Sequence, residues 1–458
     1  MNRTIFREYD IRGIVATDLT DDVVKALGCS FGTLMRKKGY SSVACGYDLR
    51  LSSAHLQSVF LEGLLSTGCW AIDVGQVPTP ALYFSTLHFD TDAGVMITGS
   101  HNPIEFNGIK MLDRQGSIYG QQIQSLLRII DEGSYAVAQP GELRCRAILP
   151  EYIRMLKSKF NFKRSLKIVI DAGNATAGPI APSLWSDLGM EVVPLYCEPD
   201  GSFPNHLPDP TVPKYMRDLQ ARVIAEKADL GLGYDGDADR VGAVDENGRL
   251  IFADTLLALF SRDVLRREPG AQIIFDVKCS QALPQVIKEA GGKPLMWKTG
   301  HSLLKAKMKQ EGAPFAGEMS GHMFFADDYF GYDDGIYASG RLMQIISDGE
   351  LSFSQLVDQI PRFESTPEIR VECADEEKFA VVEQLVDRFA AYETNTIDGV
   401  RVQFADGWGL VRASNTQPVL VLRFEAVSES ALRSIMQLFS TELGRFSAVK
   451  IAPEDFAI

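Results

Sequence analysis

A pattern of three strands occurs three times within the first three-quarters of the chain. In each copy an apolar strand ends near an aspartate, an amphipathic helix and a second strand follow, and a third strand runs into a polar loop. The copies are about a hundred residues apart, and each ends at the same topological place. The leading strands are 43–47, 168–170 and 273–275, the second strands are 71–74, 192–196 and 294–297, and the third strands run into 98–101, 233–237 and 317–320. The pattern predicts three topologically similar mixed α/β domains in tandem.

The last hundred residues or so break this pattern, so we expect a smaller C-terminal α+β domain packed across a central cleft. Its boundary is expected between Pro361 and Pro367, in a polar stretch bracketed by two prolines. Strands are expected near 368–371, 400–404 and 419–424. The apolar faces of two helices should form its core, with Phe379, Val382, Val386 and Phe389 on the first and Leu432, Ile435, Met436 and Phe439 on the second.

The first polar loop, 98–103, places the hydroxyl of Ser100 just beyond a buried strand, 93–97. In open α/β sheets ligands bind at the carboxyl ends of the strands, and the Asn102-Pro103 pair keeps regular structure from continuing. A hydroxyl held there can carry a covalent group. A polar turn that satisfies only its own backbone groups explains these six residues equally well.

The second loop, 234–240, carries carboxylates at alternating positions, on Asp235, Asp237 and Asp239. Three such groups cannot all stay ionised side by side without a cation, and Mg²⁺ suits phosphoryl transfer because it accepts carboxylate and phosphate oxygens together. An EF-hand loop has similar spacing, but Arg240 stands where that loop needs glycine, and the flanks are typical of strands. A solvated acidic turn remains the alternative.

Two further loops offer groups that suit a phosphorylated sugar. Glu318 and Ser320 lie two residues apart in the third loop, so both can reach neighbouring hydroxyls from one side of an extended segment. Near the C-terminus, loop 412–418 combines a guanidinium, hydroxyls, an amide and turn N–H groups, which together suit a phosphate that is bound but not transferred. Each of these loops also has an ordinary structural explanation as a polar turn.

Composition excludes several classes of function. The net charge of −14 argues against nucleic acid or an anionic membrane as partner. No apolar run approaches the roughly 20 residues of a membrane span, and the N-terminal residues lack the apolar core of a signal peptide. The seven cysteines are scattered, as expected of reduced thiols in a cytoplasmic protein.

Taken together, these motifs resemble the α-D-phosphohexomutases, the phosphomannomutase/phosphoglucomutase family. The four loops match, and so do the segments 6–13, 46–50, 107–110, 276–279, 298–301 and 333–337, so the resemblance covers essentially the whole chain. Leu207 departs from the pattern, because many members carry a second histidine there. Phosphoglucosamine mutases usually carry glutamine where Met319 stands, so the resemblance favours mannose and glucose phosphates.

The resemblance implies an isomerase that interconverts hexose 1-phosphate and hexose 6-phosphate through a phosphoserine and a bound hexose 1,6-bisphosphate. It implies one Mg²⁺ per chain, hexose 1,6-bisphosphate as activator, phosphosugars as small-molecule partners, and a monomer or weak dimer. The implied domains are a phosphoserine-loop domain at 1–146, a metal-binding domain at 147–250, a sugar-recognition domain at 251–363 and a phosphate-clamp domain at 364–458.

The same resemblance assigns roles to individual residues. The catalytic residues are Ser100, Lys110, Arg12, His101 and Arg240. The metal ligands are Ser100, Asp235, Asp237 and Asp239. The residues that bind substrate are Tyr9, Lys278, His301, Glu318, Ser320, His322, Arg412, Ser414, Asn415 and Thr416.

The general base is chosen by charge. Lys110 follows Ser100 by ten residues, and like-charge repulsion from Arg12 and Arg240 would favour its neutral form, so we expect Lys110 to act as the base. His101 is expected mainly to shape the loop, with His322 as a second acid/base candidate.

Two other classes of protein remain as alternatives. A serine hydrolase would use Ser100 and His101, but neighbours in sequence rarely reach triad geometry, no GxSxG elbow is present, and a metal cluster would be superfluous. Sensitivity to chelation separates the two. A sugar-phosphate binding protein would need no serine beside three aspartates. Detection of a phosphate on Ser100 that disappears when sugar phosphate is added would exclude such a binding protein.

Overall fold

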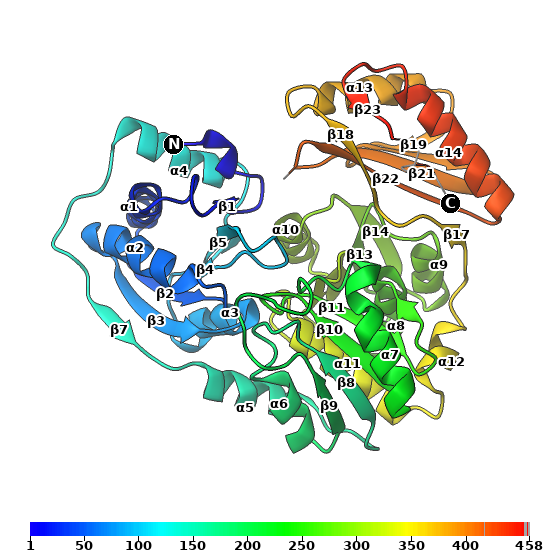
Figure 1. Ribbon diagram of the computed structural model, residues 1–458, viewed down its shortest axis with the longest axis horizontal. Helices are drawn as coiled ribbons and strands as arrows, with labels where there is room; N and C mark the ends of the chain where they lie inside the picture. The colour runs from blue at the N-terminus through cyan, green and yellow to red at the C-terminus, as the bar shows by residue number, and fades with distance from the viewer. Residues whose placement is uncertain (416, 453–455, 457–458) are drawn as a thin grey trace.

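The chain folds into four units, each built on one sheet, which we call domains 1 to 4 in chain order (Figure 1). The computed structural model describes residues 1–415, 417–452 and 456. Domain 1 (blue) lies at the left of Figure 1, domains 2 and 3 (green to yellow) at the lower right, and domain 4 (orange and red) above them. Within the described residues, no helix has the length and apolar character needed to cross a bilayer.

Domain 1 contains a seven-stranded sheet in the order β1-β5-β4-β2-β3-β7, with β6 paired to β5. Its strands are β1 Ile11–Ile14, β2 Ser42–Tyr47, β3 Trp70–Gln76, β4 Ala93–Ile97, β5 Phe106–Asp113, β6 Gly116–Ser117 and β7 Leu143–Cys145. Its helices are η1 Arg3–Ile5, α1 Asp21–Lys37, α2 Ser53–Ser66, α3 Thr79–His88 and α4 Gln121–Glu132.

Domains 2 and 3 contain five and four strands. The elements of domain 2 are α5 Leu149–Lys159, β8 Lys167–Asp171, α6 Ala181–Asp187, β9 Glu191–Leu195, η2 Pro213–Met216, α7 Arg217–Glu226, β10 Leu230–Tyr234, β11 Val241–Asp245 and β12 Leu250–Ile251. Those of domain 3 are α8 Ala253–Arg267, β13 Gln272–Asp276, α9 Ala282–Glu289, β14 Lys293–Trp297, α10 His301–Glu311, β15 Phe315–Gly317, β16 Met323–Phe325, α11 Gly335–Asp348 and α12 Phe353–Val357.

One arrangement of four strands is common to these three domains. The orders β5-β4-β2-β3, β11-β10-β8-β9 and β16-β15-β13-β14 correspond strand for strand. In each, the last three strands are parallel and the first is antiparallel to its neighbour. The prediction of three similar mixed α/β domains is therefore confirmed, and the polar loops after β4, β10 and β15 all leave the carboxyl ends of equivalent strands.

Domain 4 is built on an antiparallel sheet in the order β19-β20-β21-β22-β18-β23, with β17 paired to β22. Its elements are β17 Glu364–Ser365, β18 Ile369–Cys373, α13 Lys378–Arg388, β19 Glu393–Asn395, β20 Val400–Phe404, β21 Gly407–Ala413, β22 Val419–Ala426, α14 Glu429–Leu443 and β23 Val449–Lys450. Ser428 caps α14 by accepting a hydrogen bond from the backbone N–H of Ala431.

Of the two helix faces predicted to form the core of domain 4, one is confirmed and the other is partly wrong. On α14 the predicted apolar residues are buried, as expected. On α13 the predicted face is partly wrong, because the side chain of Phe379 is 57% exposed. The residues that face the core are Val381, Leu385 and Phe389, which lie four residues apart and so share one face of the helix.

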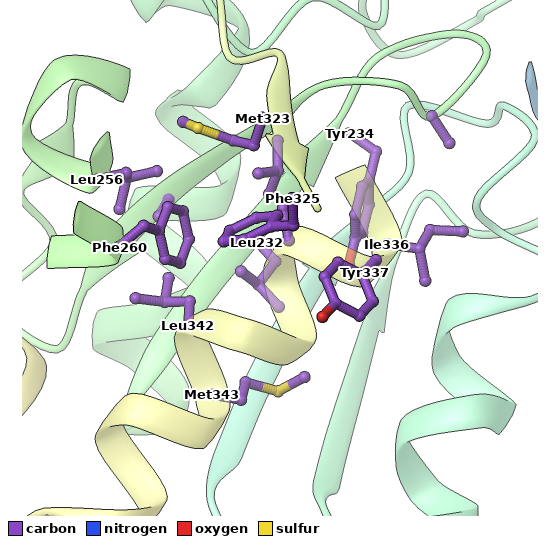
Figure 2. Close-up of a cluster of buried hydrophobic side chains, with 14 of the residues drawn as sticks. Leu232, Tyr234, Leu256, Phe260, Met323, Phe325, Ile336, Tyr337, Leu342 and Met343 are labelled. Carbon is purple, nitrogen blue, oxygen red and sulfur yellow. The ribbon is translucent and has the colours of Figure 1, made fainter. Parts of the chain in front are cut away.

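Domains 1, 2 and 3 share a continuous hydrophobic core, whereas the core of domain 4 is separate. Figure 2 shows the part between domains 2 and 3, where Leu232 and Tyr234 from β10 lie near Ile336 and Tyr337 from α11. Helix α11 begins after Asp334, whose carboxylate accepts the N–H of Tyr337. Shared packing of this kind fixes the loops of the first three domains relative to one another. Domain 4 meets domain 3 through polar contacts and through a small apolar cluster, in which Val277 packs with Trp408 and Leu410.

Candidate active site

The loop after β4 holds Ser100 in an uncommon backbone conformation. Its φ is +46°, a left-handed value that costs free energy for a residue with a side chain and that surrounding contacts must maintain. The N–H of Ser100 donates to Thr98 Oγ1 at 2.8 Å, and Thr98 Oγ1 donates to Asp48 Oδ2 at 2.7 Å. The loop is therefore braced by the end of β2, the strand next to β4 in the sheet.

The hydroxyl of Ser100 points at the metal loop of domain 2. Its Oγ donates to Asp235 Oδ2 at 2.6 Å and lies 3.0 Å from His101 Nδ1. Ser100 itself is almost completely buried. The structure thus brings together two loops that are 135 residues apart in the chain.

Asp235, Asp237 and Asp239 form a compact cluster between β10 and β11. All three are completely buried, and one carboxylate oxygen from each lies within 4.8 Å of the others. Among the described residues, Asp237 Oδ1 has no hydrogen-bond partner, and Asp239 Oδ1 meets only a ring nitrogen of His322, at 3.2 Å. Buried carboxylate oxygens without donors are costly, and hard oxygen ligands suit Mg²⁺, so the donor set fits that ion. The flanks are strands, which excludes an EF-hand.

Lys110, on β5, faces this cluster directly. Its Nζ donates to Asp237 Oδ2 at 2.6 Å and to Asp239 Oδ2 at 2.5 Å. Burial lowers the pKa of Lys110, but Asp237 and Asp239 outweigh burial and hold that pKa well above its usual value. The expected lowering of the Lys110 pKa by Arg12 and Arg240 is therefore wrong, because the Asp237 and Asp239 carboxylates contact its ammonium directly.

The neighbouring basic residues have other partners. Arg12 donates to Asn102 Oδ1 at 3.1 Å and to Asp10 Oδ2 at 2.7 Å, so it contacts the serine loop itself. Arg240 donates from Nε to His322 Nε2 at 3.1 Å. Burial, and then Arg240, Arg12 and Lys110, hold the pKa of His101 well below its usual value, so its imidazole is neutral.

The third loop brings Glu318, Ser320 and His322 together. Glu318 Oε2 accepts from Ser320 Oγ at 2.9 Å and lies 2.7 Å from His322 Nδ1. His322 Nε2 lies 3.2 Å from Asp239 Oδ1, which joins the sugar loop to the metal loop. Burial and Arg240 lower the pKa of His322, but Asp239 and Glu318 outweigh them and raise it.

Tyr9 of domain 1 contacts both domain 3 and domain 4. Its hydroxyl donates to the carbonyl oxygen of Thr299 at 2.7 Å and accepts from Asn415 Nδ2 at 2.6 Å. Its ring meets that of His301 edge-on, with centroids 6.1 Å apart. Burial raises the pKa of the Tyr9 phenol, so the hydroxyl stays protonated.

The fourth loop lies beside these residues. Arg412 Nε donates to Asp398 Oδ2 at 2.8 Å, and Asp398 Oδ2 also accepts the N–H of Thr299 at 3.0 Å. Ser414 Oγ accepts the N–H of Gln417 at 3.1 Å. Thr416, which the sequence also assigns to substrate binding, lies outside the described residues.

Lys278 lies at the joint between domains 3 and 4. Its Nζ donates to Glu368 Oε2 at 3.0 Å and lies 3.9 Å from Asp276 Oδ2. Burial raises the pKa of Glu368, but Lys278 and Arg370 outweigh it and lower that pKa to about 2. Lys278 therefore forms an ion pair with a carboxylate of domain 4 at this joint.

Several residues that contact the site were not among the site residues predicted from the sequence. Thr79 donates to Asp237 Oδ2 at 2.6 Å, and Asp333 Oδ2 lies 3.5 Å from His301 Nδ1. Asp48 and Arg50 brace the serine loop. Asp48, Arg50 and Asp333 occur in segments that matched the family, so the signal was present, whereas nothing in the sequence marked Thr79.

Models of four protein domains match this chain in order. They are described as phosphoglucomutase/phosphomannomutase alpha/beta/alpha domains I, II and III and C-terminal domain, and they match residues 3–136, 150–248, 252–363 and 368–441. Together these matches span most of the chain.

Individual relatives agree with these matches. The chain is 47% identical to a phosphomannomutase/phosphoglucomutase of Pseudomonas aeruginosa, over 96% of this chain and 95% of the relative. It is 44% identical to a phosphoglucomutase of Neisseria meningitidis, over 95% and 96%. A crystal structure of a phosphoglucomutase/phosphomannomutase family protein from Burkholderia thailandensis superposes with a TM-score of 0.92 at 41% identity, covering 98% of this chain and 100% of that one.

Proposed function

The chain belongs to the phosphoglucomutase/phosphomannomutase family, and on that basis we propose that it moves a phosphoryl group between O1 and O6 of glucose and mannose phosphates. The observation that carries this proposal is the contact between Ser100 Oγ and Asp235 Oδ2. It places a nucleophilic hydroxyl against a buried carboxylate cluster whose donor set suits Mg²⁺.

Two phosphoryl transfers make up the reaction. In the first, the bond between phosphorus and Ser100 Oγ breaks while the free hydroxyl of the sugar phosphate bonds to phosphorus. The sugar hydroxyl loses a proton and Oγ gains one, which gives hexose 1,6-bisphosphate. This intermediate reverses its orientation within the site. Ser100 Oγ then bonds to the other phosphorus while the bond between that phosphorus and the sugar oxygen breaks, so Oγ loses a proton and the sugar oxygen gains one. A bisphosphate that escapes leaves Ser100 without its phosphate, so added hexose 1,6-bisphosphate acts as activator by restoring it.

Asp235, Asp237 and Asp239, with an oxygen of the Ser100 phosphate, would hold one Mg²⁺, which when bound draws charge from the transferring group. Lys110 donates to two of these carboxylates and stays charged, so its ammonium lies beside the path of the phosphoryl group. Arg12 and Arg240 add positive charge at the serine and sugar loops. Electrostatic stabilisation of this kind supplies much of the catalysis of phosphoryl transfer.

The remaining site residues bind the sugar phosphate. Glu318 would accept hydrogen bonds from ring hydroxyls, and Ser320, His322 and His301 would exchange hydrogen bonds with them; the contacts among the side chains of the third loop support this role. The phosphate that is not transferred binds at the domain 4 joint, away from the aspartates. Its ligands are Tyr9, Lys278, Arg412, Ser414, Asn415 and Thr416.

We assign to His101 the proton that Ser100 Oγ loses in the second transfer, when Oγ bonds to phosphorus. Its Nδ1 is 3.0 Å from that oxygen, and its lowered pKa keeps the ring neutral, so Nδ1 accepts a proton in the tautomer that carries the ring proton on Nε2. Lys110, in contrast, is held charged by its two aspartates. We therefore move the role of base from Lys110 to His101 and keep Lys110 as an electrostatic catalyst.

Replacing His101 with asparagine is expected to lower kcat by roughly 10²-fold or more, the usual contribution of a general base, with KM changed only a few-fold. His55→Asn is the matched control, because His55 is an exposed histidine of domain 1 paired with Asp21. Steady-state kinetics of both variants, beside Lys110→Ala, make the comparison. Full kcat in His101→Asn together with a large loss in Lys110→Ala would return the role of base to Lys110.

The substrate assignment is tested with a coupled assay on mannose, glucose and glucosamine 1-phosphates, with a trace of hexose bisphosphate and Mg²⁺. Turnover of the mannose and glucose compounds is expected to exceed that of the glucosamine compound, in keeping with Met319 in the sugar loop. Inactivity on all three would overturn the proposed function. We further propose a cytoplasmic protein, which the scattered cysteines support, and a monomer or weak dimer. Cell fractionation checks the compartment, and light scattering checks the oligomeric state.

A further inference from the structure

One guanidinium holds most of the backbone of the serine loop. Arg50 follows β2 and is only 3% exposed. Its two terminal nitrogens donate to backbone carbonyls, at distances that include 2.7 Å to Pro103 and 2.8 Å to Ser100. The five acceptors are the carbonyl oxygens of Gly99, Ser100, Asn102, Pro103 and Phe106. These carbonyls therefore converge on a single cation.

Only arginine can make this set of contacts. Guanidinium is planar and carries five N–H donors in a fixed fork, whereas a lysine ammonium is a point charge with three donors. The left-handed φ of Ser100 is unfavourable on its own, so contacts of this kind are what maintain it. Arg50 thus restrains the loop from outside, in addition to Thr98 within it, which accepts the N–H of Ser100.

Gly99 makes room for the guanidinium. A Cβ atom at position 99 would overlap Arg50 Nε and Cζ, so a larger residue would push the side chain away from the loop. The N–H of Gly99 also donates to Asp48 Oδ2 at 3.0 Å, and that oxygen lies 3.7 Å from Arg50 Nε. The loop is therefore held by both the carboxylate and the cation of one segment, 48–50.

Domain 2 covers the guanidinium. The ring of Phe203 lies over Arg50 with 5.4 Å between Cζ and the ring centroid, and Phe203 is 7% exposed. Two glycines of domain 2 approach the same region so closely that a Cβ would overlap backbone, Gly201 against Leu49 and Gly236 against Ser100. The domain that carries the metal aspartates thus packs on the residue that shapes the serine loop.

We propose that Arg50 is a positioning residue for phosphoryl transfer, whose guanidinium, held in place by Phe203, sets the position of Ser100 Oγ relative to Asp235. The inference rests on the proposed role of Ser100 as phosphoryl carrier. Arg50 contacts only backbone atoms of the loop, so it acts on the position of the reacting oxygen and not on the substrate. The phosphate clamp in domain 4 does not depend on it.

Arg50→Lys tests this directly. Because a displacement of the reacting atom by about 1 Å can cost 10²-fold in rate, kcat is expected to fall by roughly 10²-fold. KM for the sugar phosphate should stay within about threefold, since the clamp is remote. In ³¹P NMR of the phosphorylated enzyme, the Ser100 resonance should shift or broaden. A purely structural role would lower the melting temperature and the active fraction without moving kcat per folded molecule.

Phe203→Leu and Gly99→Ala provide independent variants in case Arg50→Lys does not fold. Each is expected to reduce kcat by about 10-fold or more, since each lets the guanidinium move. Phe160→Leu is the control for Phe203→Leu, because it removes an aromatic ring that is equally buried, at 7% exposed, but packs on Trp185 and not on Arg50. It should keep wild-type kcat.

Phosphate on Ser100 in the wild-type protein is measured first, after incubation with hexose 1,6-bisphosphate and Mg²⁺, by intact mass and peptide mapping. If it is absent, the proposed phosphoserine function fails, and this inference fails with it. If it is present and folded Arg50→Lys, Phe203→Leu and Gly99→Ala all keep wild-type kcat and the wild-type ³¹P resonance, the inference alone is overturned.

Discussion

Replacing Ser100 with alanine is expected to lower kcat for hexose phosphate interconversion by about 10⁴-fold or more, the range seen when a covalent nucleophile is removed. The variant has no oxygen to carry the phosphoryl group. Its fold should survive, because the loop is held through backbone groups, by Thr98 at the N–H of residue 100 and by Arg50 at the carbonyl. A coupled assay and intact-mass analysis of the phosphorylated protein provide the measurement.

Ser125→Ala is a suitable control, because Ser125 is a residue of α4 in domain 1 whose hydroxyl, within the described part of the chain, bonds to Gln121 and Arg128 of its own helix. It should keep wild-type activity and the wild-type phosphate content. Substantial turnover by Ser100→Ala, or one phosphate per chain remaining on that variant, would show that another group carries the phosphoryl.

The positions of the loops could be predicted from the sequence because they depend on strand ends. Apolar runs of five or six residues that stop at polar residues mark where buried strands finish, and the threefold repetition showed that three such ends are equivalent. Ser100, Asp235 and Glu318 were located in this way. Their meeting follows from the shared core of domains 1 to 3.

The charge environment of Lys110 could not be predicted in this way. Its surroundings depend on the register of β5, which pairs Lys110 with Met96 and directs the ammonium to the aspartates of another domain. Register between strands and packing between domains are long-range properties that the local sequence leaves open. The sequence pointed instead to Arg12 and Arg240, and therefore to a lowered pKa of Lys110, where the carboxylates that contact it raise that pKa.

The face of α13 was misassigned for a related reason. Phe379, Val382 and Val386 follow helical spacing, and so do Val381, Leu385 and Phe389. When apolar residues cover more than one face of a helix, helical periodicity cannot decide which face is buried. The sheet of domain 4 decides between them, and it packs against Val381 and Leu385.

The brace formed by Asp48 and Arg50 depends on strand order in the same manner. Strand β2 lies beside β4 in the sheet, so their carboxyl ends meet and the segment after β2 reaches the serine loop. The family motif marked these two residues without saying what they contact. Their role becomes visible only when the backbone carbonyls they bind are known.

Replacing Asp237 with asparagine is expected to raise the Mg²⁺ concentration for half-maximal activity by roughly 10²-fold or more, because removing a charged partner from a buried site costs several kcal/mol. Asp237 is completely buried, one of its oxygens lacks a hydrogen-bond partner within the described residues, and the other binds Thr79 and Lys110. An asparagine amide would place N–H groups toward one of those donors or toward the cation. Activity titrated against Mg²⁺, and calorimetric binding of Mg²⁺ to the phosphorylated enzyme, are the measurements.

Asp245→Asn separates loss of a ligand from loss of a buried charge. Asp245 is equally buried in domain 2, but its carboxylate pairs with Arg249 at 2.5 Å, away from the three-aspartate cluster. This control should lose stability without changing the Mg²⁺ dependence of the remaining activity. Removal of divalent cations with a chelator should also abolish turnover in the wild type, and added Mg²⁺ should restore it. Turnover that persists unchanged in chelator would mean that the carboxylates neutralise Lys110 and neighbouring cations instead of holding a metal, because Lys110 alone already pairs with two of them.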